Sequence, residues 1–397
     1  MQLRYQFRLY PTQAQCIELA RAFGCARVVF NDAVGTRRAA HEAGLPFVSD
    51  TELSKLLITE AKKTPERAWL GQVSAVVLQQ ALSDACAAYR NFFASISGKR
   101  RGPRMRPPRF RSRKDNRQAV RFTRNARFKV GVKLTLPKIG DVAVKWSRPL
   151  PAEPSSVTVI KDAAGRYFAS FVVDVGNDPL PACGTEVGID LGLSHFAVLS
   201  DGTKVSNPRF LRRAEKKLRK FQKALSRTQK GSRNRAKART KVARRHTKVA
   251  DARREFHHQL STRLIRDNQA VYVEDLAVNG LARTRLAKSV HDAGWSAFVN
   301  MLEYKATRHG RGFARIGRFE PTSQVCSACG IKDGPKPLHI REWTCPACGV
   351  CHDRDHNAEK NVLAAGQADR INACGAEVRP ASTLAHGHEA GSQRGAA

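Results

Sequence analysis

Two pairs of cysteines limit the folds open to this chain more than any other feature of its sequence. Cys326 and Cys329 form one Cys-x2-Cys pair, fifteen residues follow, and Cys345 and Cys348 form the second pair. Each pair lies in a CSACG or CPACG segment, and this spacing is typical of a four-cysteine zinc ribbon. Four thiolates complete a tetrahedron and leave no position for water. We therefore predict a structural zinc ion.

The segment around and after the second pair, CPACGVCHDRDHNAEKNVL, combines sulfur and oxygen ligands. Cys351 and His352 follow the pair so closely that either could replace one of its cysteines as a zinc ligand. Asp353 and Asp355 come next, and carboxylates suit Mg²⁺ or Mn²⁺ better than thiolates do. A single metal seldom takes both kinds of ligand, so the segment is expected to serve two metal sites. An EF-hand calcium loop is excluded, because Ala358 occupies the position of its glycine.

Three acidic residues follow one another in an order that suits metal-dependent cleavage of nucleic acid. Asp190 ends a predicted strand in VGIDLGLSHFAVLSDG, Glu274 ends one in AVYVEDLAV, and Asp355 lies nearest the start of the predicted helix NAEKNVLAA. Two catalytic metal ions need carboxylates that converge from separate elements, and ribonuclease-H-like nucleases carry their acids in this order. We predict that these three acids hold Mg²⁺ or Mn²⁺ and that Asp353 supports them.

The charge of the chain indicates a polyanionic partner. Its 397 residues include 70 Lys and Arg against 34 Asp and Glu, a formal net charge of +36. One basic region is the arm GKRRGPRMRPPRFRSRKDNRQAVRFT, whose prolines exclude a helix. Another is residues 208–254, where 20 Lys and Arg accompany two acids and apolar spacing predicts an antiparallel helical hairpin. Helices this poor in acids need an anion to screen their repulsion, so nucleic acid is the expected partner.

Candidate nucleic-acid contacts come from these basic regions, and two glutamines of the helical segment VVLQQALSDACAAYRNFF are candidate readers of base edges. For both glutamines an exposed helix face is the simpler interpretation. The candidates are Arg104, Arg106, Arg109, Arg111, Arg121, Arg212, Arg213, Arg219, Arg244, Arg245, Gln79 and Gln80.

The remaining periodicity predicts an α+β multidomain chain. Residues 1–10 alternate as a strand, the chain to about Phe93 is mostly helical with one apolar stripe, and FKVGVKLTLPKIGDVAVKW and SVTVIKDAAGRYFASFVVDV alternate as antiparallel strands. A β-barrel-like domain with a helical insertion is the simplest arrangement. Arg4 and Arg8 interrupt any signal-peptide core, and no later apolar run approaches bilayer length. We expect a soluble intracellular protein with no membrane partner.

Taken together, the motifs resemble those of the TnpB family, RNA-guided nucleases of bacterial insertion sequences that are related to compact type V CRISPR effectors. The resemblance spans nearly the whole chain and rests on FRLYPTQAQ, AYRNFF, GIDLGLSHFAVLSDG, DAGWSAFVNMLEYKA, TSQVCSACG, REWTCPACG and HDRDHNAEKN. It implies a wedge-like β domain (1–20 and 94–180), a helical recognition insertion (21–93), a RuvC-like nuclease domain with ribonuclease H α/β fold (181–322) that contains the basic hairpin (208–266), an inserted zinc ribbon (323–351) and the last part of the nuclease domain (352–378). A disordered tail (379–397) is expected from its composition.

The resemblance also implies an activity and its partners. It places the catalytic acids on Asp190, Glu274 and Asp355 and the zinc ligands on the four paired cysteines. The implied function is RNA-guided, metal-dependent cleavage of double-stranded DNA that matches a bound guide RNA and lies next to a short duplex motif. We expect a monomer with one guide RNA in the bacterial cytoplasm, associated with the nucleoid when bound to DNA. The alternatives are a DNA transposase with the same acids, a non-enzymatic zinc-ribbon repressor, and a CRISPR-associated version of the same nuclease.

Overall fold

The computed structural model describes residues 1–115, 117–318, 320–337 and 339–373. It divides the chain into two compact units, one of residues 1–175 and one that begins at Gly176. The tail predicted to be disordered, residues 379–397, lies outside the described residues. None of the helices in the described ranges combines the length and the apolar composition that a membrane-spanning segment needs.

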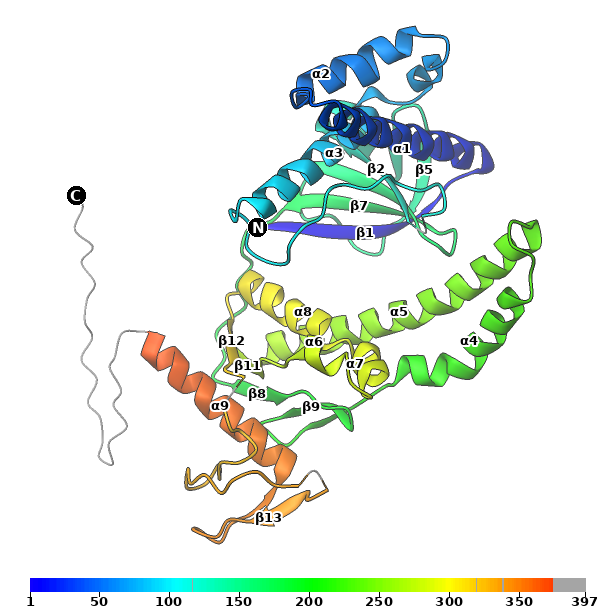
Figure 1. The fold of residues 1–397 in the computed structure, drawn as a ribbon. Coiled ribbons are helices and arrows are strands. Elements are labelled where there is room, and N and C mark those ends of the chain that lie inside the picture. The colour runs from blue at the N-terminus through cyan, green and yellow to red at the C-terminus, as the bar shows by residue number, and fades with distance from the viewer. Residues whose placement is uncertain (116, 319, 338, 374–397) are drawn as a thin grey trace, which may run out of the picture. The chain divides into compact units, whose positions relative to one another are not determined.

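The first unit is built on an antiparallel sheet with the strand order β2-β6-β7-β1-β5-β4-β3, and this sheet is curled (Figure 1). The first strand of the chain lies inside the sheet, where it pairs with β7 on one side and β5 on the other. Tyr5, Phe7 and Leu9 of this strand are buried, as its alternation predicts. The strands are β1 (Gln2–Tyr10), β2 (Gln118–Thr123), β3 (Lys129–Val130), β4 (Lys133–Leu136), β5 (Gly140–Lys145), β6 (Ser156–Lys161) and β7 (Tyr167–Asp174).

Helices of the first unit pack on this sheet. Thr12 caps the first helix: its side chain accepts from the backbone N–H of Gln15, and the Gln15 side chain accepts from the backbone N–H of Thr12. The predicted apolar stripe of α3 is buried from Val77 to Tyr89, but its last member, Phe93, is 47% exposed because the helix runs beyond the core there. The helices are α1 (Gln13–Glu42), α2 (Asp50–Ser54), η1 (Lys55–Glu60), η2 (Ala61–Lys63), η3 (Ala68–Gln72), α3 (Ala75–Ile96) and η4 (Arg124–Ala126).

The second unit is built on a mixed sheet with the strand order β10-β9-β8-β11-β12. β8, β11 and β12 run parallel to one another, and β9 is antiparallel to β8. A pair of short strands, β13 and β14, forms a separate hairpin beside this sheet. The strands are β8 (Glu186–Asp190), β9 (His195–Leu199), β10 (Lys204–Ser206), β11 (Ala270–Glu274), β12 (Gly312–Ile316), β13 (Glu342–Thr344) and β14 (Cys351–Asp353).

Helices cover both faces of this second sheet, and the alternation of β11 shows how. Val271 and Val273 face a core that includes Leu264 of α5 and Phe298 of α8, whereas Tyr272 faces α9 on the other side. Strands covered on both faces are apolar throughout, and residues 270–273 are all buried. The helices are α4 (Phe210–Ser226), α5 (Arg233–Asp267), α6 (Val278–Leu281), α7 (Ala287–Ala293), α8 (Trp295–Arg308) and α9 (Arg354–Ala373).

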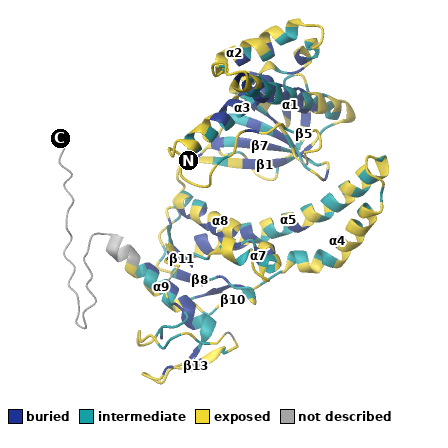
Figure 2. Cartoon of the chain, in the orientation of Figure 1, coloured by how far each residue is buried: buried dark blue, intermediate teal, exposed yellow. Residues whose placement is uncertain are grey.

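Two basic helices, α4 and the first half of α5, project from the second unit as an antiparallel pair (Figure 1). Their contact is narrow: Leu218 and Val249 are buried, while Phe221 and Phe256 are half-buried. Most other side chains along the pair are exposed (Figure 2). The pair therefore offers two long cationic surfaces to solvent.

Candidate active site and metal centre

Strand pairing in the second unit brings two of the predicted acids together. Ile189 of β8 lies opposite Val273 of the parallel neighbour β11, so the next residues, Asp190 and Glu274, end adjacent strands at the same edge of the sheet. The carboxyl ends of parallel strands are where α/β sheets place their functional groups. Both side chains are half-buried.

Helix α9 brings the third acid to the same edge. It crosses β8 so closely that a Cβ built on Gly188 would lie 2.7 Å from the backbone nitrogen of Leu363 and would overlap the carbonyl oxygen of Glu359. Only glycine fits there, and an alanine would force the helix outward at a cost of about 1–3 kcal/mol. This close crossing places the first turn of α9, with Asp355, beside Asp190.

The pKa of Asp190 reflects the proximity of the other two acids. Burial, then the negative charges of Glu274 and Asp355, raise its pKa to about 7.

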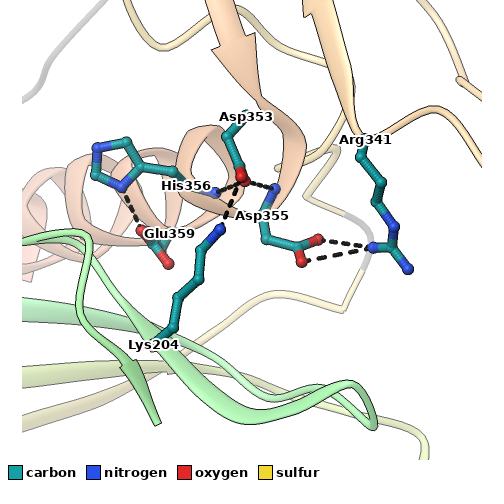
Figure 3. A network of polar contacts seen from close by, with 6 residues as sticks. All are labelled: Lys204, Arg341, Asp353, Asp355, His356 and Glu359. Carbon is teal, nitrogen blue, oxygen red and sulfur yellow. Dashed lines mark hydrogen bonds and ion pairs between the residues drawn. The ribbon is translucent and has the colours of Figure 1, made fainter. Parts of the chain in front are cut away.

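Asp353, the neighbour of Asp355, has a supporting position (Figure 3). One of its oxygens accepts from the backbone N–H groups of Asp355 and His356, each at 3.0 Å, and so caps α9. The other oxygen lies 2.8 Å from Nζ of Lys204. Burial would raise the pKa of Asp353, but the Lys204 ammonium group and the backbone donors outweigh it and lower the pKa. One oxygen therefore fixes the start of the helix, and the other is paired with Lys204.

Within the described part of the chain, Glu274 and Asp355 each have one side-chain donor. The hydroxyl group of Thr322 donates to Oε1 of Glu274 at 2.6 Å. Arg341, which precedes β13, lies 3.3 Å from an oxygen of Asp355 (Figure 3). Thr322 directly precedes the cysteine segment and Arg341 lies within it, so this part of the chain orients two of the three acids.

A fourth carboxyl group, which sequence reasoning missed, lies at the same place. Glu359 is fully buried on α9, one turn after Asp355. Its Oε1 lies 2.5 Å from Nδ1 of His356, and its Oε2 has no hydrogen-bond partner in the described part of the chain. Burial, and then the charge of Asp190, raise the pKa of Glu359 to about 9. The spacing of four residues from Asp355 in HDRDHNAEKN was a signal that could have identified it.

Replacing Glu359 with glutamine is expected to stabilise the second unit at neutral pH in the absence of added Mg²⁺. An unfolded glutamate releases its proton near pH 4.5, whereas the folded one retains it to about pH 9, so the wild type loses stability as the pH rises between these values. Glutamine has no such loss. Urea unfolding at pH 4, 6 and 8 measures the difference, and Glu255→Gln, an exposed change on α5, is the control. A Glu359→Gln gain that is equal at all three pH values would contradict the buried neutral carboxyl.

The four paired cysteines form one compact group. Their sulfur atoms all lie within 4.8 Å of one another, and the closest pairs are Cys326 with Cys348 at 3.6 Å and Cys329 with Cys345 at 3.7 Å. Thiolates around a tetrahedral zinc ion at about 2.3 Å are separated by about 3.8 Å, which is close to these values. The group could therefore hold zinc.

Cys351 and His352 differ in their relation to this group. Cys351 is exposed and outside the set of four sulfurs. His352 is buried, its ring lies 4.9 Å from that of Trp343, and its Nε2 is 3.0 Å from the sulfur of Cys326. His352 therefore contacts a predicted zinc ligand directly.

Two asparagines of α9 join the cysteine segment to the acidic edge. The buried Asn357 accepts from the backbone N–H of Ser327 at 2.8 Å and donates to the carbonyl oxygen of Val325 at 2.7 Å. Asn361 donates to the carbonyl oxygens of Thr322 and Val325. The first cysteine pair is thus fixed to the helix that carries Asp355.

The candidate nucleic-acid contacts of the first unit separate into two groups. Arg111 and Arg121 both pair with Asp84, at 3.3 and 2.6 Å, and Arg111 also stacks on Phe30. Their guanidinium groups tie the basic arm to α3. The other candidates lie toward solvent: Gln80 is half-buried, and the exposed ones are Arg104, Arg106, Arg109 and Gln79.

The candidates of the second unit lie on the two basic helices. Arg219 pairs with Glu215 at 2.9 Å, and Arg245 stacks over Phe221 at 5.0 Å. A groove of about 790 Å³ runs along α4, and its lining consists of six Lys and Arg residues, Arg212 among them, with Glu215 and Ala224. The exposed candidates here are Arg212, Arg213, Arg219 and Arg244.

Comparison with known proteins assigns the chain to a family. The model of the IS605 OrfB family, described as "Probable transposase", matches residues 170–285, and a "Cas12f1-like, TNB domain" model matches residues 295–362. A curated relative from Streptomyces pristinaespiralis, "Putative RNA-guided DNA endonuclease", is 45% identical over 380 residues, which cover 95% of this chain and 92% of the relative. The chain belongs to the TnpB family. A second relative, "Putative RNA-guided DNA endonuclease InsQ" from Escherichia coli K12, is 30% identical over 96% of each chain.

Solved structures show that this TnpB-family chain shares its fold with compact CRISPR effectors. The protein in a structure titled "Cryo-EM structure of the Cas12f1-sgRNA-target DNA complex" matches with a TM-score of 0.54 and 13% identity, over 87% of this chain and 82% of that chain. Another, "Structure of the mini-RNA-guided endonuclease CRISPR-Cas_phi3", matches with a TM-score of 0.51 and 10% identity over 92% of both chains.

A further family model, "Helix-turn-helix domain", matches residues 1–45 of the TnpB-family chain. Here these residues form β1 and the single continuous helix α1, Gln13–Glu42. A strand followed by one long helix does not provide the second, groove-reading helix of a helix-turn-helix. Residues 1–45 therefore match the helix-turn-helix family model in sequence but do not form a helix-turn-helix that could read bases.

Proposed function

We propose that this TnpB-family chain is an RNA-guided, metal-dependent DNA endonuclease. The observation that carries the proposal is the convergence of Asp190, Glu274 and Asp355 from β8, β11 and α9 on one edge of the second sheet. The names of the curated relatives support it, since two that match over at least 92% of their length are named for this activity. The arrangement of the sheet and α9 also supports a RuvC-like, ribonuclease H fold for residues 181–322 and 352–378, with the residues between them as an inserted ribbon.

The acidic edge has the donor set of a site for Mg²⁺ or Mn²⁺. Carboxylate oxygens are the ligands these hard cations prefer, and the unpartnered Oε2 of buried Glu359 adds one more oxygen beside them. Asp190, Glu274 and Asp355 would hold the cations. When bound, a pair of such cations activates water and stabilises the leaving 3′ oxygen of a phosphodiester.

The protein side chains contribute orientation. Thr322 holds the carboxylate of Glu274 by its hydrogen bond, and Asp353 fixes the first turn of α9 and with it Asp355. Arg341 places a positive charge next to Asp355, where it would also attract the phosphate group of an incoming strand. These contacts keep the acids in position before the substrate arrives.

The exposed basic surfaces fit a guide RNA and a DNA duplex as partners. Arginines of the arm and of α4 and α5 contact solvent in rows, and such rows bind phosphates with little sequence discrimination. A nuclease that cuts duplex DNA without a reader would destroy the genome, so pairing with a guide must supply the sequence. We assign the arm to RNA binding and the helical region before Phe93, with Gln79 and Gln80, to the flanking DNA motif.

The direct test uses the protein purified together with its RNA and a plasmid that carries a matching site. Cleavage that needs both Mg²⁺ and the RNA supports the proposal. Binding without cleavage would favour a repressor, and RNA-independent joining of DNA strands would favour a transposase.

The cysteine group is proposed to hold one structural Zn²⁺ per chain. Elemental analysis of the purified protein is expected to give one zinc per chain, and a Cys345→Ser, Cys348→Ser double variant is expected to lose it. The double variant should also lose cleavage, because the ribbon orients Thr322 and the start of α9 through Asn357 and Asn361.

Cys351→Ser is the matched control for this prediction. Cys351 is exposed and outside the group of four, so its replacement should change neither zinc content nor cleavage. Zinc that persists in the double variant, or that disappears from Cys351→Ser, would refute the assignment of the ligands.

A further inference from the structure

His352 lies in the chain between the cysteine group and the helix that carries Asp355. It is the middle residue of β14, which runs from Cys351 to Asp353. Across the β13–β14 hairpin it pairs with Trp343, whose strand ends one residue before Cys345. His352 is thus next to the residue that caps α9, and its strand partner is two residues from a predicted zinc ligand.

The side chain of His352 is buried against the first cysteine pair. It is 8% exposed, and its Nε2 lies 3.0 Å from the sulfur of Cys326, which is itself fully buried. The His352 ring also lies 4.9 Å from the Trp343 ring. The ammonium group of Lys336 is 3.6 Å from the centroid of that Trp343 ring and helps to hold it in place. These contacts keep the His352 ring in one orientation.

The buried cysteines of the group need hydrogen-bond donors from the protein. Two of the four cysteines are exposed, so water can solvate their sulfurs. Cys345 is buried, and the backbone N–H groups of Ala347 and Cys348 donate to its sulfur. Cys326 is buried as well, and a thiolate withdrawn from water is costly unless a donor faces it. Nε2 of His352 is in position to be that donor.

The geometry favours a hydrogen bond over direct ligation of zinc by His352. A nitrogen at about 2.0 Å and a sulfur at about 2.3 Å from one tetrahedral zinc ion are separated by about 3.5 Å. The observed distance of 3.0 Å is shorter. The nitrogens of His352 are also outside the set of ligand atoms that lie within 4.8 Å of one another. Because a zinc-bound thiolate accepts hydrogen bonds, the nitrogen that faces it would carry the proton.

We propose that His352 is a positioning residue of the zinc centre, whose Nε2–H group donates to the Cys326 sulfur and holds the first cysteine pair against β14. This inference rests on the zinc centre of the proposed function. The hydrogen bond draws negative charge away from a sulfur in a centre whose four thiolates exceed the charge of Zn²⁺. It also ties the first cysteine pair to the strand that leads directly into Asp353.

The test compares two replacements of His352 in the purified full-length protein. His352→Phe keeps a ring beside Trp343 but has no donor, so excess chelator should remove its zinc about tenfold faster or more. His352→Gln places an amide N–H group near the position of Nε2 and should release zinc at nearly the wild-type rate. A side chain that only filled space would be replaced equally well by phenylalanine, which has a ring of similar size.

A spectroscopic measurement on the same variants reports on the sulfur itself. With Co²⁺ in place of zinc, the sulfur-to-cobalt charge-transfer band should move to longer wavelength in His352→Phe, because loss of the hydrogen bond raises the energy of the sulfur electrons. The band should keep its position in His352→Gln. His339→Phe is the matched control, since it makes the same change at an exposed position of the ribbon and should alter neither the band nor the release rate.

His352→Asn, whose amide is too short to reach the sulfur, replaces His352→Phe if phenylalanine prevents folding, and the same results are expected from it. Wild-type release and an unmoved band in the variant without a donor, or fast release from His352→Gln as well, would overturn the donor role. A wild-type cobalt spectrum of three sulfurs and one nitrogen would also overturn it, because His352 would then be a ligand. A wild type without zinc would refute the proposed zinc centre and this inference with it, whereas a zinc-loaded protein that cuts no DNA would refute only the nuclease.

Discussion

Replacing Asp190 with alanine is expected to abolish Mg²⁺-dependent DNA cleavage while leaving nucleic-acid binding nearly intact, and Glu274→Ala and Asp355→Ala should do the same. Each change removes one carboxylate from a site that must hold two cations against a phosphodiester, so the cleavage rate should fall on the order of 10³-fold or more. Binding should change little, because the exposed arginines of the arm, α4 and α5 supply it. Single-turnover cleavage and a gel-shift titration with the guide RNA measure the two effects separately.

Asp353 provides the internal control for this prediction. Because it caps α9 and pairs with Lys204, Asp353→Asn should disturb the position of Asp355 rather than remove a ligand. Asparagine still caps a helix, and a loss of about 10- to 100-fold is typical for residues that orient metal ligands. Substantial cutting by Asp355→Ala, together with none by Asp353→Ala, would show that the two acids exchange these roles.

The site could be predicted from sequence where its geometry is local or is fixed by strand direction. Each Cys-x2-Cys pair forms its own turn, so the spacing alone indicated the compact cysteine group that the structure contains. Asp190 and Glu274 each end an apolar strand, and parallel strands place such residues at one edge. The first inference required no knowledge of distant contacts, whereas the second required β8 and β11 to pair, which the order of the acids indicated.

The rest of the site depends on how segments far apart in the sequence pack against one another. The spacing of residues along the sequence does not predict that packing. Glu359 is buried because α9 crosses β8 at Gly188, and the rotation of that helix is not encoded in its weakly patterned sequence. The sequence of the arm does not distinguish one arginine from another. In the structure, Arg111 and Arg121 pair with Asp84 of α3, whereas Arg104 is exposed to solvent. Composition identified the basic surface without showing which of its members are already paired.

Changing the guide segment of the bound RNA is expected to move cleavage to the newly matched DNA. The protein is purified with its RNA, reconstituted with an RNA that differs only in the guide segment, and offered two plasmids that share the flanking duplex motif but differ in the matched sequence. Cutting should appear at the new match and fall to background at the old one. The reason is that the described basic surfaces contact phosphate and helical shape, which carry affinity but no sequence information.

Two controls test whether cleavage requires the RNA and the catalytic acids. Protein stripped of RNA should bind DNA through its Lys and Arg side chains but cut neither plasmid. Asp190→Ala with the new guide should bind the newly matched DNA without cutting it. Mismatches next to the flanking motif should abolish cutting, whereas distant ones should be tolerated for binding, because pairing begins beside that motif.

If cutting remained at the old site, or proceeded equally well without RNA, guidance by RNA would be wrong. The acids of β8, β11 and α9 would then serve a transposase that recognises DNA through the protein itself.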